Sequence, residues 1–163
     1  MIFSSILVAN RAEIAIRIVR ACSDLGLRAT TVYSEDDAES LHCRMGDASH
    51  ALRGSGPSAY LDGDALIKAA LLHGCDAIHP GYGFLSERAD FAEQCAAAGL
   101  VFIGPSSEHL ALFGDKTRAR NAAIKAKVPV TRGVDYAVSL EEAKTFFESL
   151  KADGQAMIIK AKS

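Results

Sequence analysis

Short apolar segments alternate with helix-patterned segments along most of this chain. Residues 5–9 (SILVA), 28–33 (RATTVY), 76–79 (DAIH) and 100–103 (LVFI) have the length and composition of buried strands. Longer stretches with helical periodicity separate them. Strands that alternate with helices form parallel sheets that are covered on both faces. The alternation therefore predicts an α/β fold, a Rossmann-like parallel sheet with helices on both faces.

Three helices and one further short strand are predicted between these segments. In the first helix, over 12–25, apolar residues recur with the helical period: Ile14, Ile18, Cys22 and Leu25. Gly26 is placed to end this helix. A second helix is predicted over 64–73, and a third begins with Ser86 as its N-cap. Residues 48–52 suit a short strand.

The last third of the chain follows a different pattern. An alanine-rich helix is predicted over 115–127, and a capping box (Ser139 to Glu142) starts another helix. A strand is predicted over 156–159, and no further element follows to complete a layer with it. We therefore expect one domain over 1–114, followed over 115–163 by a linker helix and the truncated start of a second domain.

The composition is that of an ordinary globular domain. Hydrophobic residues make up 49% and charged residues 23%, and the net charge is −2, so we expect no nucleic-acid partner and no anionic membrane. No apolar stretch approaches the roughly 20 residues of a membrane span, and we see no secretory signal. The four cysteines form no CxxC or CxxH pair. We therefore expect reduced thiols in the cytoplasm and no metal site.

The turn after the first strand, Asn10-Arg11, lacks the glycines of a GxGxxG dinucleotide fingerprint. Two interpretations stay open. Asn10 or Arg11 presents a polar group to a ligand or a neighbouring domain. Alternatively, the segment only begins a helix that carries the ion pairs Glu13–Arg17 and Arg20–Asp24. The residue types alone favour the second interpretation.

The segment HPGYGFLSE, from His79 to Glu87, follows a predicted strand. Its glycines permit positive φ or the close approach of a partner, and they flank Tyr82. A tyrosine at this place is poorly suited to core packing and well suited to touch a ligand, but the segment could equally be a tight connection. The later segment FIGPS, with its Gly-Pro turn, is mostly structural.

Two lysines occupy unusual positions. Lys116 lies at the start of a predicted helix, where the helix dipole disfavours a cation unless an anion is near. Lys160 follows the apolar strand predicted over 156–159. Both suit phosphate binding, although each lysine taken alone is more often a solvated surface residue.

Taken in order, the segments ILVANR, EIA, AIHPGYGFLSE, FIGPS, GDK and IIKA resemble the N-terminal region of biotin carboxylases. These are ATP-grasp ligases of the acyl-CoA, pyruvate and urea carboxylases. The resemblance covers residues 6–161 and implies a Rossmann-like pre-ATP-grasp domain. It also implies an enzyme that uses ATP, Mg²⁺ and bicarbonate to carboxylate carrier-bound biotin.

The resemblance implies roles for particular residues. The lysines that contact ATP phosphates are Lys116 and Lys160. The loop beside the bicarbonate and biotin pocket carries Tyr82 and Gly83, with His79 and Glu87 as supporting neighbours. Arg17 falls on the helix that forms the subunit interface in dimeric members. Ala12 departs from the family, which usually has glycine there, so the backbone of the first turn is expected to differ.

The same resemblance places the catalytic base, the metal-binding glutamates and the glycine-rich lid beyond Ser163. We therefore expect no catalytic residue and no metal ligand within 1–163, and no activity from this fragment alone. The expected partners are a biotin carboxyl carrier domain, a carboxyltransferase and a second copy through the first helix. The acyl or keto acceptor stays open.

Three other functions compete with this one. Another ATP-grasp ligase, such as a carbamoyl-phosphate synthetase, resembles the HPGYGFLSE segment much less closely. A free-standing nucleotide-binding or dinucleotide-binding module is disfavoured by the absent GxGxxG and the unfinished tail. The third alternative is a non-catalytic dimerisation module that uses the helix around Arg17.

Overall fold

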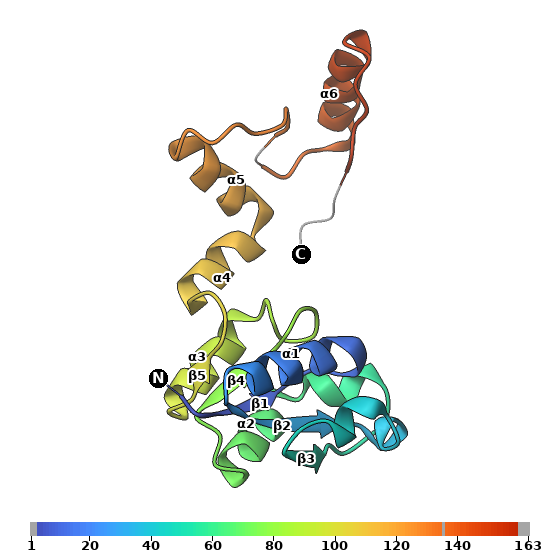
Figure 1. Cartoon of the computed structure of the whole chain (residues 1–163). Coiled ribbons are helices and arrows are strands. Elements are labelled where there is room, and N and C mark those ends of the chain that lie inside the picture. Colours follow the sequence, from blue (N-terminus) through green and yellow to red (C-terminus); the bar gives the residue numbers. More distant parts are fainter. Residues whose placement is uncertain (1–2, 135, 160–163) are drawn as a thin grey trace. The chain divides into compact units, whose positions relative to one another are not determined.

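A computed structural model describes residues 3–134 and 136–159 (Figure 1). The chain divides into two compact units, Met1–Ala111 and Leu112–Ser163, which are described separately. Among the described residues, no helix has the length and apolarity that crossing a membrane requires.

The first unit is built on a five-stranded parallel sheet with strand order β3-β2-β1-β4-β5. The strands are β1 (Ser5–Val8), β2 (Arg28–Tyr33), β3 (Ala48–Ala51), β4 (Ala77–His79) and β5 (Val101–Phe102). Every residue of the central strand β1 is buried. The apolar segments identified in the sequence are therefore strands of one parallel sheet, as predicted.

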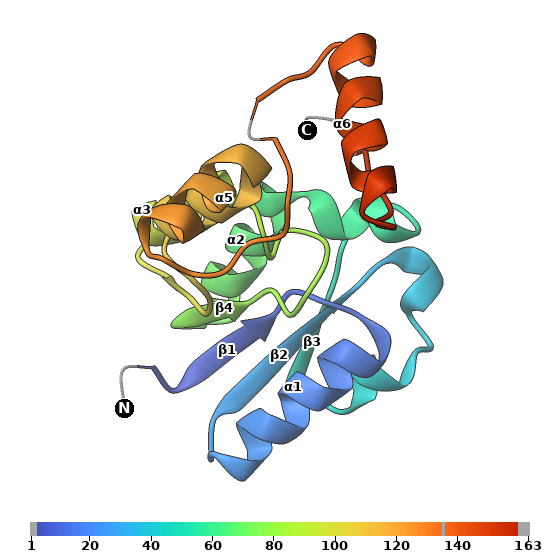
Figure 2. The same cartoon turned by 90° about the horizontal axis from the view of Figure 1, so that it is seen from above.

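Helices cover both faces of this sheet. Successive residues of a strand point to opposite faces, so the apolar residues of β1 pack against helices on both sides. Ile6 and Val8 pack in one apolar cluster with α1 (Ala12–Asp24). Leu7 packs in a second cluster with α2 (Gly63–Leu72) and α3 (Ala89–Ala97). Figures 1 and 2 show α1 and α2 on opposite sides of the strands. The predicted fold class is confirmed.

Short 3-10 helices lie in the connections on both sides of β3: two take the place of an α-helix between β2 and β3, and one precedes α2 between β3 and β4. These are η1 (Glu35–Asp37), η2 (Leu41–Arg44) and η3 (Pro57–Leu61). They carry three buried side chains that can hydrogen-bond: Asp37, His42 and Tyr60. Polar groups are therefore enclosed next to the turn that follows β1.

The prediction that Ser86 caps the third helix is wrong. Helix α3 begins at Ala89, and its N-cap Arg88 makes no side-chain cap. The Ser86 N–H instead donates to the Gly83 carbonyl at 2.9 Å. Positive φ at Gly83 and Phe84 folds residues 83–86 into a tight turn, which delays the start of the helix.

The second unit contains α5 (Lys116–Lys125) and α6 (Leu140–Ala152), while α4 (Ser107–Gly114) includes the boundary between the units. The predicted capping box of α6 is present: the Glu142 N–H donates to Ser139 Oγ and the Ser139 N–H donates to the Glu142 carboxylate. Residues 156–159, predicted as a strand, form no strand. A strand needs a hydrogen-bonded neighbour, and the described part of this unit provides none.

Candidate functional site

The loop after β4 lies directly beside the end of β1. The two strands are neighbours, with Val8 in register with His79, and the Ala9 N–H donates to the His79 carbonyl at 2.9 Å. The turn after β1 and the loop over 80–84 therefore meet at the carboxyl edge of the sheet. In open parallel sheets this edge is where ligands bind.

Asn10 joins the turn to the loop. Its side chain is completely buried, and its Nδ2 donates to the carbonyl oxygens of Pro80 at 2.7 Å and Tyr82 at 2.9 Å. Both amide hydrogens are thus used within the chain. Of the two interpretations of Asn10, the structure supports a structural role in place of direct ligand contact.

His79 supports the same loop from the end of β4. The Gly81 N–H donates to its Nδ1 at 3.0 Å, so this nitrogen carries a lone pair and no proton. Burial lowers the pKa of the imidazole, which favours the neutral form that this hydrogen bond requires. His79 therefore acts as a hydrogen-bond acceptor for the loop.

The loop presents Tyr82 to the outside. The Tyr82 side chain is 63% exposed, and its hydroxyl donates to Glu13 Oε1 at a long 3.4 Å. Gly83 follows with a φ of +70°. Glu87 is exposed on the chain leading to α3, and its carboxylate has no hydrogen bond or ion pair with any described residue. An exposed tyrosine on a tightly held loop is well placed to contact a ligand.

An open hollow of about 510 Å³ lies on the α1 side of this loop. A hollow of this volume would suit a small ligand. Its lining includes Arg17, His79 and Tyr82, so the structure brings three of the predicted site residues together. The expected Glu13–Arg17 and Arg20–Asp24 ion pairs are absent from the described residues. The helix start is therefore stabilised by other contacts.

The principal contact is an ion pair between Arg11 and Asp37, with 2.6 Å between Nη2 and Oδ1. The Tyr60 hydroxyl donates to the other Asp37 oxygen at 2.7 Å and accepts the Ser34 N–H at 3.1 Å. Arg11 also lies 5.7 Å from the centre of the Tyr60 ring. Like Asn10, Arg11 is used within the chain. This network could not be predicted from the sequence, because its members are far apart along the chain.

The network perturbs both of its acids. Burial would raise the pKa of Asp37, but hydrogen bonds from Tyr60 and Arg11 outweigh burial and lower it. Burial, together with the hydrogen bond to Asp37, raises the pKa of Tyr60 to about 12. The arrangement therefore keeps Asp37 ionised and Tyr60 protonated at neutral pH.

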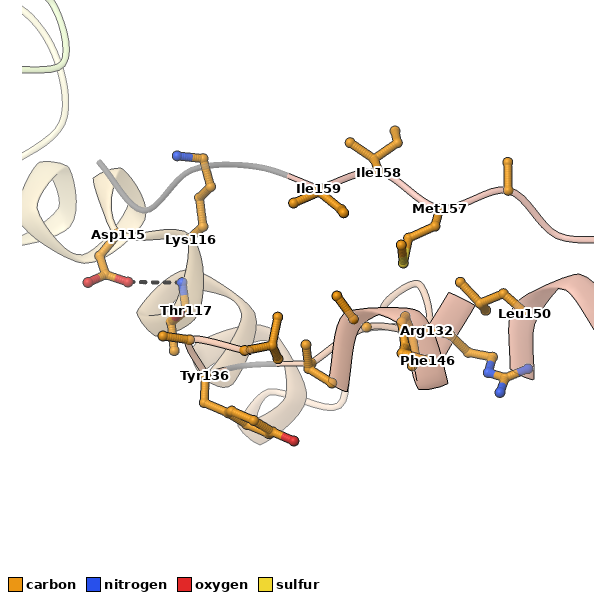
Figure 3. A pocket seen from close by; sticks show the side chains of 16 residues that line it. Asp115, Lys116, Thr117, Arg132, Tyr136, Phe146, Leu150, Met157, Ile158 and Ile159 are labelled. Carbon is orange, nitrogen blue, oxygen red and sulfur yellow. Dashed lines mark hydrogen bonds between the residues drawn. The ribbon is translucent and has the colours of Figure 1, made fainter. Parts of the chain in front are cut away.

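The second unit has its own pocket, of about 450 Å³. Figure 3 shows Lys116 at its edge and apolar side chains along it, among them Phe146, Leu150 and Met157. Arg132 also lines the pocket and pairs with Asp153. A cationic edge on an apolar wall suits a ligand with an anionic group and an apolar part.

Asp115 caps α5 next to Lys116. Its carboxylate accepts the N–H groups of Thr117 at 2.9 Å and Arg118 at 3.0 Å. An anion from the chain itself therefore accompanies the lysine at this helix start, and the position of Lys116 alone does not require a bound phosphate. Lys160, the other predicted phosphate ligand, lies outside the described residues.

A comparison with known protein families identifies the architecture around this site. The family model described as "Biotin carboxylase, N-terminal domain" matches residues 2–110. The chain belongs to the biotin carboxylase N-terminal domain family. The matched residues include the strands β1 to β5, the Asn10 turn and the Tyr82 loop.

Relatives of this biotin carboxylase N-terminal domain are much longer proteins. Pyruvate carboxylase of Bacillus subtilis is 50% identical over 159 residues, which are 96% of this chain and 14% of that protein. Biotin carboxylase of Haemophilus influenzae is 48% identical over 158 residues, which are 96% of this chain and 35% of that protein. The chain thus spans about a seventh to a third of these relatives.

Solved structures agree with the family assignment. The biotin carboxylase domain of a single-chain bacterial carboxylase has a TM-score of 0.85 and 54% identity, covering 92% of this chain and 34% of that one. The biotin carboxylase domain dimer of 2-oxoglutarate carboxylase from Hydrogenobacter thermophilus, in complex with MgADP and bicarbonate, has a TM-score of 0.82 and 38% identity, covering 92% of this chain and 33% of that one. The fold of this N-terminal domain is therefore shared with solved members of the family.

Within the described part of this biotin carboxylase domain, no three His, Cys, Asp or Glu side chains are grouped so that they could hold a metal ion. The structure gathers Arg17, His79 and Tyr82 around one hollow, with Gly83 next in the loop and Glu87 beyond it, before α3. Their roles toward substrates stay predictions. The sequence did not predict the residues that support the loop from other elements, above all Tyr60, whose ring stacks on Phe84.

Proposed function

We propose that residues 1–163 are the N-terminal part of a biotin carboxylase that uses ATP and bicarbonate to carboxylate carrier-bound biotin. The observation that carries this proposal is the Tyr82 loop, which Asn10 and His79 hold at the carboxyl edge of the sheet. Membership of the family and the small share of each relative that the chain covers support it further.

In this proposal the exposed Tyr82 and Gly83 lie beside the bicarbonate and biotin pocket. His79 acts through the loop backbone, since its Nδ1 already accepts the Gly81 N–H. Glu87 carries a free carboxylate among the described residues, which makes it available to a substrate or to a neighbouring part of the enzyme.

We further propose that Lys116 and Lys160 contact the phosphates of ATP. The pocket of the second unit, with Lys116 at its edge and an apolar lining, has the chemistry that a nucleotide requires. Mg²⁺ would neutralise phosphate charge when bound with the nucleotide. The domain boundary between 114 and 115 belongs to the same proposal.

The proposed partners are a biotin carboxyl carrier domain, a carboxyltransferase and a second copy of the chain. A solved relative is described as a single-chain, multi-domain long-chain acyl-CoA carboxylase, and another as a domain dimer. Arg17 on α1 makes no ion pair among the described residues, which leaves it free to contact a partner. All four cysteines are free thiols, which favours a reducing compartment such as the cytoplasm.

Steady-state kinetics of the complete carboxylase test the proposed role of the loop. Tyr82→Ala removes an exposed ring and leaves the buried core untouched, so the enzyme should fold normally. We expect its KM for free biotin to rise about tenfold, which is about 1.4 kcal/mol, with the KM for ATP within about twofold of the unaltered value.

Lys116→Gln provides the matched control, because it should raise the KM for ATP and leave the KM for biotin unchanged. A Tyr82→Ala enzyme that keeps its biotin KM would remove Tyr82 from the substrate side of the site. An unchanged ATP KM in Lys116→Gln would count against the phosphate role of the lysine.

A further inference from the structure

Asn10 uses both of its amide hydrogens to hold the loop. Its two amide hydrogens go to the carbonyls of Pro80 and Tyr82, and its Oδ1 accepts the Arg11 N–H at 2.9 Å. This arrangement requires two donors and one acceptor on one planar group. A neutral amide provides them, whereas a carboxylate would turn an oxygen toward two carbonyl oxygens.

The loop backbone packs directly on this amide at Gly81. A Cβ at position 81 would lie 2.7 Å from Asn10 Nδ2 and 2.7 Å from Ile14 Cγ2. Gly81 also has a φ of +68°, which favours glycine. The contact therefore depends both on the amide of Asn10 and on the absence of a side chain at Gly81.

The loop is held in a conformation that it would not keep unaided. Gly81, Gly83 and Phe84 all have positive φ, and Phe84, at +44°, is not a glycine. Strained backbone of this kind persists only where its surroundings fix it. The Phe84 ring stacks on Tyr60 with 5.2 Å between ring centres, while Asn10 holds the other end. Tyr82 is held directly by Asn10 through its carbonyl and lies two residues before Phe84.

We propose that Asn10 is a positioning residue that sets the direction of Tyr82 and thereby the affinity of the enzyme for biotin. Asn10 is itself buried and acts only through the carbonyls of Pro80 and Tyr82. This inference rests on the proposed function of the Tyr82 loop. It adds that biotin affinity depends on a side chain that never touches the substrate.

Steady-state kinetics of the complete carboxylase with free biotin test this inference. Asn10→Asp keeps the shape of the side chain and replaces a donor with an acceptor. We expect the biotin KM to rise about tenfold, or about 1.4 kcal/mol, while the ATP KM stays within about twofold. Gly81→Ala disturbs the same contact from the loop side and should likewise raise the biotin KM without changing the ATP KM. It provides a second test if Asn10→Asp fails to fold.

Val19→Ala is the matched control, because Val19 is buried on α1 in the cluster with Ile6 and Val8 and is not among the residues that line the hollow beside the loop. It should change neither KM beyond about twofold, since a partly unfolded population lowers only the amount of active enzyme. A similar biotin KM shift in Val19→Ala would show a general effect of destabilisation and would overturn the inference. So would folded Asn10→Asp and Gly81→Ala enzymes with unchanged biotin KM.

The Tyr82→Ala enzyme separates this inference from the proposed function. If Tyr82→Ala raises the biotin KM and the Asn10 and Gly81 variants do not, only the positioning role fails. If Tyr82→Ala leaves the biotin KM unchanged, the role of the loop fails and the positioning role with it.

Discussion

Ala12, the first residue of α1, has a φ of +48°. A residue with a Cβ pays about 1–2 kcal/mol for the left-handed region, whereas glycine enters it freely. The backbone was expected to differ here because the family usually has glycine at this position. The structure shows that the backbone has the conformation that suits glycine, and that the alanine bears strain.

Ala12→Gly should therefore stabilise the protein by about 1 kcal/mol, because it relieves the strained φ. Urea denaturation of residues 1–163 measures the change. Ala21→Gly, at an exposed position within the same helix, is the control and should cost about 1 kcal/mol. Equal destabilisation by the two substitutions would show that Ala12 is not strained.

At the same scale, the sequence could not decide what Asn10 and Arg11 do. It showed two polar residues at the end of a buried strand, a place that suits both ligands and internal contacts. Their roles depend on contacts with Asp37 and Pro80. These two residues are distant in the chain and lie nearby only because the sheet brings them together. Residue types at a turn predict that a polar contact exists, but not its partner.

At the scale of elements, strands and helices followed closely from periodicity. The strand over 28–33 was predicted with the bounds that the structure has, because β-branched residues fill its centre. The failures were local. Residues 156–159 have the composition of a strand but lack a neighbour to pair with, and Ser86 lies in a turn whose positive φ values no composition reveals.

The Arg11–Asp37–Tyr60 network joins the start of α1 to η1 and η3. Tyr60→Phe removes the hydrogen bond to Asp37 and leaves the buried Ser34 N–H unpaired. We expect a loss of about 1–3 kcal/mol in the free energy of unfolding of the first unit at pH 7. Urea denaturation of residues 1–163 measures it.

The loss should depend on pH in a defined direction. The pKa of Asp37 is lower in the folded protein than in the unfolded chain. Asp37 therefore contributes stability above its unfolded pKa of about 4 and loses it as pH falls through the folded pKa. The difference between Tyr60→Phe and the unaltered protein should shrink between about pH 5 and pH 3. A difference that stays constant or grows would show that Tyr60 does not stabilise the ionised carboxylate.

At the scale of the whole molecule, the chain covers 35% of a stand-alone biotin carboxylase and 14% of a pyruvate carboxylase. Its described residues include the exposed Tyr82 loop and a pocket with Lys116 at its edge. We therefore expect residues 1–163 alone to show no bicarbonate-dependent ATP cleavage with free biotin. Clear turnover would contradict the division of the site that we propose.

The most direct test of the central claim replaces the matched segment of the Haemophilus influenzae biotin carboxylase, 48% identical to this chain, with residues 1–163. ATP cleavage that depends on both bicarbonate and biotin is then measured for the chimera. Our account predicts activity within about tenfold of the native enzyme, a difference of about 1.4 kcal/mol in the barrier. A folded chimera that binds ATP and shows no such activity would contradict it.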